Sequence, residues 1–238
     1  MSAPAAAVAD VPAAFTATVV AAFAARSGPR FSLVLSGGPT ARACYEHLAA
    51  ATGPSTGVPL GPTVDWTLVD VYMGDERLVP ADDPDANQRL VRHALLDRVG
   101  PFGTFTPMPG EGDVAQCVRD YQDVMARLLE GPGIDLIHLG LGADGHTASL
   151  FPGAPTLDAG PDHLVAATED PNGRNPHPRM TLTLPAINAA RCAVFTVTGD
   201  AKRAAVDQLR QGADLPAARV EAAQVIWLVD GAAFGHAP

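Results

Sequence analysis

Residues 134–153 read IDLIHLGLGADGHTASLFPG, and this stretch decides the fold expected for the whole chain. Its first part, residues 134–139, is a short apolar run bounded by glycines, which is typical of a buried strand. Three glycines follow, and with them come Asp144 and His146. Terminal glycines let a backbone approach a ligand, and open α/β sheets bind ligands at the carboxyl ends of their strands. We therefore expect a ligand site beside His146.

His146 is the residue whose side chain best suits acid–base catalysis. The unperturbed pKa of an imidazole is about 6.5, so it can take up and release a proton near neutral pH. Asp144 either orients this imidazole or tightens the turn. The other histidines, including His138 in the predicted strand, have no partner at metal-ligand spacing, so we interpret them as structural or solvated and predict no metal site.

Composition indicates a compact globular protein. The 238 residues are 47% hydrophobic and 18% charged, which favours a single domain over residues 1–238 with a sizeable core. The net charge of −10 argues against nucleic-acid or anionic-membrane binding, but a local cluster of cations could still bind a small anion. Cys44, Cys117 and Cys192 are far apart and form no C-x-x-C motif, which favours a reducing cytoplasm.

Strand and helix patterns alternate along the chain. Alternation of this kind implies a mostly parallel, Rossmann-like doubly wound sheet with helices on both faces, an α/β fold. Residues 53–62 and 101–112 are expected to be irregular. The predicted strands cover residues 31–35, 64–73, 134–139, 164–167, 179–184, 192–198 and 225–229, and the predicted helices cover 11–25, 39–51, 86–99, 113–130 and about 201–211.

Ser36, Gly37 and Gly38 lie between a predicted strand and a predicted helix. Amides at a helix N-terminus and the hydroxyls of Ser36 and Thr40 would make an anion site there. A plain strand-to-helix turn uses the same residues, so both interpretations stay open.

Charges also gather after the second predicted strand, at residues 74–77, which read GDER. Asp75 and Arg77 belong either to a solvated turn or to a site, and their position beside a buried strand favours a site. Asn87 falls in the first turn of the next predicted helix.

Lys202 is the only lysine among the 16 basic residues, and it lies at a strand-to-helix junction. A compact ammonium group suits a phosphate, although a solvated helix residue would look the same. Arg179 begins its predicted strand, the wrong end of a parallel sheet; an antiparallel strand would bring it back to the site.

The run from Gly140 to Gly145 also fits the dinucleotide pattern G-x-G-x-x-G. The context argues against nucleotide binding, because Pro152 and Gly153 stop any long helix after the glycines, and no acidic residue ends a following strand at the required distance.

Four blocks of sequence together resemble the 6-phosphogluconolactonases. They are residues 35–40 (LSGGPT), 74–77 (GDER) with Asn87, 141–152 (LGADGHTASLFP), and 179–185 (RMTLTLP) followed by 198–202 (TGDAK). The resemblance implies the sugar-phosphate isomerase type of fold, related to glucosamine-6-phosphate deaminase. It also implies a cytoplasmic hydrolase, without metal or other cofactor, that opens 6-phospho-D-glucono-1,5-lactone in the oxidative pentose phosphate pathway.

The resemblance also implies roles for particular residues. His146 would be the general base, with Asp144 and Arg77 beside it in the catalytic set. Pro39 departs from the family, which commonly has Ser or Thr there, so Ser36 and Thr40 are expected to carry more of the binding. The residues implied to bind the phosphate and the lactone are Ser36, Gly37, Gly38, Thr40, Asp75, Asn87, Gly142, Arg179 and Lys202.

Two other functions remain as alternatives. Amino-sugar phosphate deaminases share Asp-Gly-His but usually continue Asn-Glu-Pro, whereas residues 149–152 here read SLFP and supply no carboxylate. A non-catalytic sugar-phosphate sensor would carry a DNA-binding module, for which this acidic chain has no spare residues. The expected partner is a small sugar-phosphate lactone, with no nucleic acid and no membrane, bound by a monomer or a weak homodimer.

Overall fold

The computed structural model describes residues 3–54 and 63–235. Six strands form one parallel sheet. From one edge to the other they are β4 (Thr104–Thr106), β2 (Val69–Met73), β1 (Phe31–Leu35), β5 (Leu136–Gly140), β8 (Cys192–Val197) and β9 (Gln224–Val229). Counted in chain order among themselves, these strands are arranged 3-2-1-4-5-6, which is the doubly wound order of dinucleotide-binding folds.

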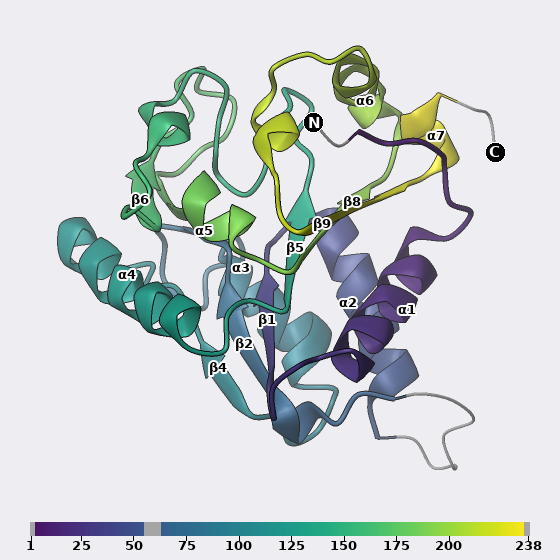
Figure 1. Cartoon of the computed structure of the whole chain (residues 1–238). Coiled ribbons are helices and arrows are strands. Elements are labelled where there is room, and N and C mark those ends of the chain that lie inside the picture. Colours follow the sequence, from purple (N-terminus) through teal and green to yellow (C-terminus); the bar gives the residue numbers. More distant parts are fainter. Residues whose placement is uncertain (1–2, 55–62, 236–238) are drawn as a thin grey trace.

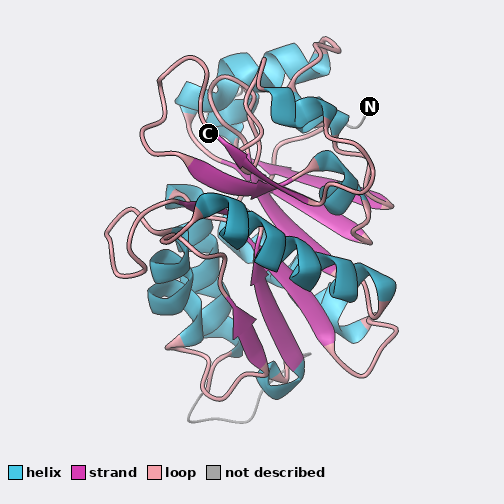
Figure 2. Cartoon of the chain, turned by 90° about the vertical axis from the view of Figure 1, so that its left-hand side faces the viewer, coloured by secondary structure: helices cyan, strands magenta, loops and turns pink. Residues whose placement is uncertain are grey.

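Helices cover both faces of this sheet, as expected (Figure 1). The pair α1 and α2 packs on one face, and α4 lies on the other, in front of the strands in Figure 2. The helices are α1 (Val11–Ala24), α2 (Pro39–Thr52), α3 (Asn87–Val91), α4 (Val114–Glu130), α5 (Leu184–Asn188), α6 (Arg203–Arg210) and α7 (Gly231–Phe234).

Local sequence explains where two of the long helices begin. The Asp10 carboxylate accepts a hydrogen bond from the Ala13 amide at 2.9 Å, and this caps α1 as its position predicts. Asp113 caps α4 in the same way through the amide of Gln116, at 2.7 Å.

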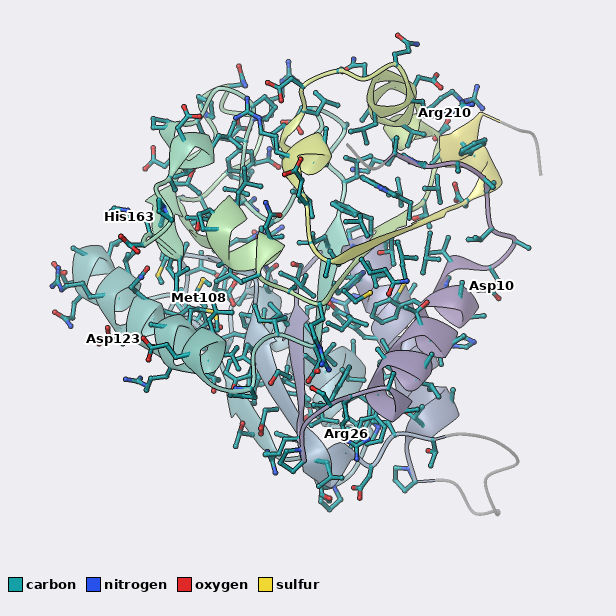
Figure 3. All side chains as sticks on the ribbon, in the orientation of Figure 1. Asp10, Arg26, Met108, Asp123, His163 and Arg210 are labelled. Carbon is teal, nitrogen blue, oxygen red and sulfur yellow. The ribbon has the colours of Figure 1, made fainter. Side chains whose placement is uncertain are left out.

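The core lies between the parallel sheet and its helices. Strands β1 and β8 are buried at every position, because both sides of each strand are covered. Figure 3 shows side chains filling these layers, with Met108 on the inner side of α4 and Asp123 on its outer side. Met108 is fully buried, whereas Asp123 is exposed.

A second, antiparallel sheet was not predicted. It consists of β3 (Asp75–Arg77), β7 (Arg179–Leu182) and β6 (Val165–Thr168), in that order. Because β3 follows β2 after the single residue Gly74, this small sheet stands directly against the carboxyl end of the large one. The charges of residues 74–77 are therefore part of a strand and not of a solvated turn.

Several predicted boundaries were wrong. The strand expected over residues 64–73 begins only at Val69, after a 3₁₀ turn at Trp66–Leu68. The helix expected over residues 86–99 divides into α3 and a π-helical turn at Arg92–Leu96, and residues 101–112 contain the short strand β4. Of the loop expected over residues 53–62, residues 55–62 lie outside the described part of the chain.

Candidate active site

A pocket of about 230 Å³ opens at the carboxyl ends of β1, β5 and β8. Successive strands run from β1 toward one edge of the sheet and from β5 toward the other, so this is the point where the strand order reverses and where such sheets bind ligands. Eleven of the twelve predicted site residues line it: Ser36, Gly37, Gly38, Thr40, Asp75, Arg77, Asn87, Gly142, His146, Arg179 and Lys202. Asp144, the twelfth, binds the His146 side chain.

His146 and Asp144 form a hydrogen-bonded pair at the end of β5. The His146 Nδ1 atom lies 2.6 Å from Asp144 Oδ1, which also accepts from the His146 amide at 3.1 Å. The pKa of Asp144 falls to about 2: partial burial opposes ionisation, but the hydrogen bonds and charge of His146 outweigh it. A carboxylate only accepts hydrogen bonds, so Nδ1 carries a proton in this pair, and Nε2 is the ring atom that can accept a proton when the imidazole is neutral. Asp144 thus both orients the imidazole and tightens the turn.

The turn between residues 140 and 146 makes room for this pair. The Gly142 amide donates to the His146 carbonyl at 2.8 Å, and a Cβ on Gly142 would lie 2.1 Å from His146 Nδ1. On its other side the imidazole packs against Phe151, with ring centroids 5.0 Å apart. The imidazole is therefore fixed in position, while its side chain stays 20% exposed.

The Ser36-Gly37-Gly38 turn presents hydrogen-bond donors to the same pocket. Gly38 has φ of +107°, which favours glycine, and within the described chain no side chain caps the α2 helix that begins at Pro39. A Cβ on Gly37 would lie 1.8 Å from Asn87 Oδ1, so this glycine lets the Asn87 side chain approach. The buried Ser36 Oγ has no hydrogen-bond partner among the described residues.

Thr40 and Lys202 come together from distant parts of the chain. Thr40 Oγ1 lies 2.7 Å from Thr198 Oγ1, which joins the first turn of α2 to the end of β8. Lys202 follows in a 3₁₀ turn, Asp200–Lys202. Burial lowers the pKa of its ammonium group, and the charge of Asp144 opposes that change.

Arg77 and Arg179 lie directly opposite each other on β3 and β7. The antiparallel pairing brings Arg179 back to the site, as the sequence suggested. Like charges facing each other across two strands are destabilising unless anions compensate them. The Arg77 Nη1 atom donates to the Asp85 carbonyl at 2.7 Å, yet the buried Nε atoms of both arginines have no partner among the described residues.

Asp75 connects the small sheet to the segment that carries His146. Its Oδ2 atom accepts from Ser149 Oγ at 2.7 Å and lies 4.0 Å from Arg179 Nη1. Burial lowers the pKa of Arg179 and the charge of Asp75 raises it, with burial the larger effect. Among the residues that line this pocket, Asp75 carries the only carboxylate, against three cations. The pocket is thus locally positive in a chain whose net charge is −10.

Sequence reasoning missed four residues that belong to the site or support it. Asn175, in the loop before β7, lines the pocket, as do His138 and Thr196. Glu76 is fully buried between two residues that line the pocket, and its carboxylate accepts from the amides of Arg77, Asn87 and Gln88. The GDER motif indicated Glu76 only as one more charge, because nothing local shows that this side chain points inward.

The described residues, 3–54 and 63–235, contain no group of three or more His, Cys, Asp or Glu side chains placed to hold a metal ion. No helix in the same ranges is both long and apolar enough to cross a membrane.

The sequence and the fold both match known proteins. The chain belongs to the family of glucosamine-6-phosphate isomerases and 6-phosphogluconolactonases, whose model matches residues 2–227. A 6-phosphogluconolactonase of Synechocystis sp. is 37% identical over 84% of this chain and 81% of its own length.

Two solved structures share the fold. The 6-phosphogluconolactonase of Trypanosoma brucei has a TM-score of 0.80 at 28% identity and covers 98% of each chain. A monomeric glucosamine-6-phosphate deaminase has a TM-score of 0.77 at 17% identity over 99% of each chain, a likeness of fold alone.

Proposed function

We propose that this chain hydrolyses 6-phospho-D-glucono-1,5-lactone to 6-phospho-D-gluconate. The observation that carries the proposal is the shared pocket of His146 and Lys202, a proton acceptor and a cation that follow the neighbouring strands β5 and β8. Family membership and relatives named for this activity support it.

In the proposed mechanism, His146 Nε2 takes a proton from a water molecule as that water attacks the C1 carbonyl of the lactone. Asp144 accepts from Nδ1 and stabilises the imidazolium that forms. The tetrahedral intermediate collapses with cleavage of the bond between C1 and the ring oxygen, which takes the proton back from His146. General base catalysis of this kind typically contributes ~10²–10⁴-fold.

The remaining groups of the pocket would bind the substrate. Donors available for the phosphate and the developing oxyanion are the Ser36 hydroxyl, the amides of the first turn of α2 after Pro39, and the cations Arg77, Arg179 and Lys202. Charge-assisted hydrogen bonds to a phosphate hold the substrate in one orientation, which lowers the entropic cost of attack.

The deaminase alternative has less support from the site. Ring opening and proton shuttling would need an acid or base besides the His146–Asp144 pair, and the pocket carboxylate, Asp75, already accepts from the Ser149 hydroxyl. The segment after His146 supplies Thr147, Ala148 and Ser149 and no carboxylate.

One assay separates the three functions. The purified chain is given freshly prepared 6-phosphogluconolactone in a pH-stat, and in parallel glucosamine 6-phosphate with detection of ammonia. We expect proton release well above the spontaneous rate and no ammonia. Ammonia release would establish the deaminase, and the absence of both signals would leave a sugar-phosphate sensor.

We further propose a single domain over residues 1–238, a monomer or weak homodimer, and a cytoplasmic location. The three cysteines, all free and buried, support a reducing compartment. Sedimentation of the purified chain at micromolar concentration tests the oligomeric state.

A further inference from the structure

We propose that Tyr45 and His138 form a buried positioning unit that holds the Ser36 turn in shape for the phosphate of the substrate. The inference rests on the proposed function, because it takes that turn as part of the phosphate site. Neither residue was predicted to have a functional role, and neither is placed to react with the lactone.

The Tyr45 hydroxyl, on helix α2, makes hydrogen bonds to the backbone directly after the end of β1. It accepts from the Ser36 amide at 3.1 Å and donates to the Ser36 carbonyl at 2.8 Å. Both main-chain groups of Ser36 are thus satisfied by one side chain that is fully buried. The direction in which the Ser36 hydroxyl points therefore depends on this contact.

The hydrogen-bond partners of His138 and its burial together define which of its ring nitrogens is protonated. The Tyr45 hydroxyl has one proton, which it gives to the Ser36 carbonyl, so the 2.7 Å contact with His138 must be donated by Nδ1–H. Burial lowers the pKa of His138 to about 3, so the ring is neutral and carries this one proton. The Nε2 atom of His138 is therefore an acceptor, and the Thr196 hydroxyl donates to it at 2.7 Å.

This chain of hydrogen bonds crosses three strands beneath the pocket. Ser36 follows β1, His138 lies in β5 and Thr196 lies in β8, and all three line the pocket. Phe15 of α1 covers the network, with its ring centroid 4.4 Å from that of His138. A buried network in which every member is satisfied holds its groups in a single arrangement. The Ser36 turn is therefore connected by hydrogen bonds to strands β5 and β8 as well as to helix α2.

The test is Tyr45→Phe, which deletes the hydroxyl and leaves the Ser36 main chain and His138 Nδ1–H unsatisfied. We expect KM for the phosphorylated lactone, and the inhibition constant of inorganic phosphate, to rise about tenfold, as the loss of such contacts predicts. We expect kcat to stay within about threefold, because His146 and Asp144 lie on a different segment.

Thr52→Val is the matched control on the same helix. Thr52 lies at the far end of α2, where its hydroxyl donates to the Leu48 carbonyl at 2.7 Å and accepts from Trp66 Nε1 at 3.1 Å. The substitution also removes a buried hydroxyl and should lower stability, but KM and phosphate inhibition should match the wild type.

The outcomes separate the inference from the proposed function. If the wild type does not hydrolyse the lactone, the proposed function fails. If the wild type is active and Tyr45→Phe keeps the wild-type KM and phosphate inhibition, the positioning role is wrong.

A measurement on the wild type covers the case in which Tyr45→Phe does not fold. Nitrogen NMR of the His138 ring between pH 5 and 8 should show a protonated Nδ1, an unprotonated Nε2 and no titration. A proton on Nε2, or an imidazole that titrates in this range, would overturn the proposed network.

Discussion

Gly142 shows how closely one residue controls the geometry of the site. Its Cα position faces the His146–Asp144 pair, where an added Cβ would lie 2.1 Å from His146 Nδ1 and 2.6 Å from Asp144 Oδ1. Carbon atoms do not approach ring nitrogens that closely, so any larger side chain must displace the imidazole. The second glycine of the run that resembles a nucleotide motif is therefore explained by a hydrogen-bonded pair.

Gly142→Ala should therefore lower kcat at least tenfold, because the added methyl group displaces the His146 imidazole and breaks its hydrogen bond to Asp144. The contacts to the phosphate should remain. Steady-state kinetics with the phosphorylated lactone measure this. Gly160→Ala is the control, since a Cβ there would meet His163 Nδ1 at an ordinary 3.5 Å. Equal kcat for both variants would show that the pair does not depend on Gly142.

Lys202 is a second single residue on which binding should depend, because it adds one positive charge to the pocket. Lys202→Ala should mainly raise KM, by about tenfold or more, since it removes one charge-assisted contact to the phosphate. Arg203→Ala removes a neighbouring, exposed cation that does not line the pocket, and its KM should be unchanged. An unchanged KM for Lys202→Ala would remove this residue from the phosphate site.

The positions of single residues at the pocket were predictable where polar residues follow a strand. Ser36, Asp75 and Lys202 stand within a few residues of a predicted strand end and His146 follows one after the glycine turn, and parallel strands bring such ends together. Tyr45 could not be found in this way, because it lies inside a helix and reaches the site only through tertiary packing.

At the scale of elements, Glu76 joins the small sheet to α3. One carboxylate accepts from the amides of Asn87 and Gln88 at 2.7 and 2.8 Å, and so caps the helix and orients Asn87. Burial raises the pKa of Glu76 to about 7, although these hydrogen bonds oppose the change. The helix cap is therefore made by a group that is costly to ionise.

The raised pKa of Glu76 makes the stability of the fold depend on pH. The folded-state pKa of about 7 lies above the ordinary value of 4.5, so the folded protein binds more protons than the unfolded chain between these values. Stability from this group is present in full below about pH 4.5 and is lost as the pH rises through 7. Between pH 4.5 and a pH well above 7, the free energy of unfolding should fall by roughly 3 kcal/mol through this group.

Glu76→Gln should remove this dependence. Urea unfolding at a series of pH values gives the free energy of unfolding of each protein, and the difference between wild type and variant should change between pH 4.5 and 7. The wild type should lose stability relative to Glu76→Gln as the pH rises. Parallel curves would mean that Glu76 is ionised in the folded protein at the pH of a free carboxyl.

Element boundaries were predictable where caps and periodicity agree, as for α1 and α4. They failed near Trp66, because the Asp65 side chain accepts from the Thr67 amide at 3.1 Å and stabilises a 3₁₀ turn where the apolar pattern suggested a strand. The strand β4 was missed because three residues are too few for a period to show.

At the scale of the whole molecule, alternation of strands and helices was enough to predict a doubly wound parallel sheet. The strand order was not predictable, because pairing joins segments far apart in the sequence and no local pattern records it. The small antiparallel sheet was missed for the same reason, although the position of Arg179 at a strand start had suggested one antiparallel return.

The strand order in turn explains the position of the pocket. Successive strands run from β1 and β5 toward opposite edges, which leaves an opening above the carboxyl ends of these two strands. Strands β3 and β7 of the small sheet close one side of this opening with Arg77 and Arg179. The negative net charge of the chain and the cationic pocket are thus separate properties of one molecule, and only the pocket bears on the substrate.

The most direct test of the account is the turnover of His146→Ala on freshly prepared 6-phosphogluconolactone, with His93→Ala, an exposed histidine outside the pocket, as the control. We predict that kcat falls by at least two orders of magnitude for His146→Ala, with KM little changed, and that His93→Ala matches the wild type. A kcat for His146→Ala close to that of the wild type would contradict the account.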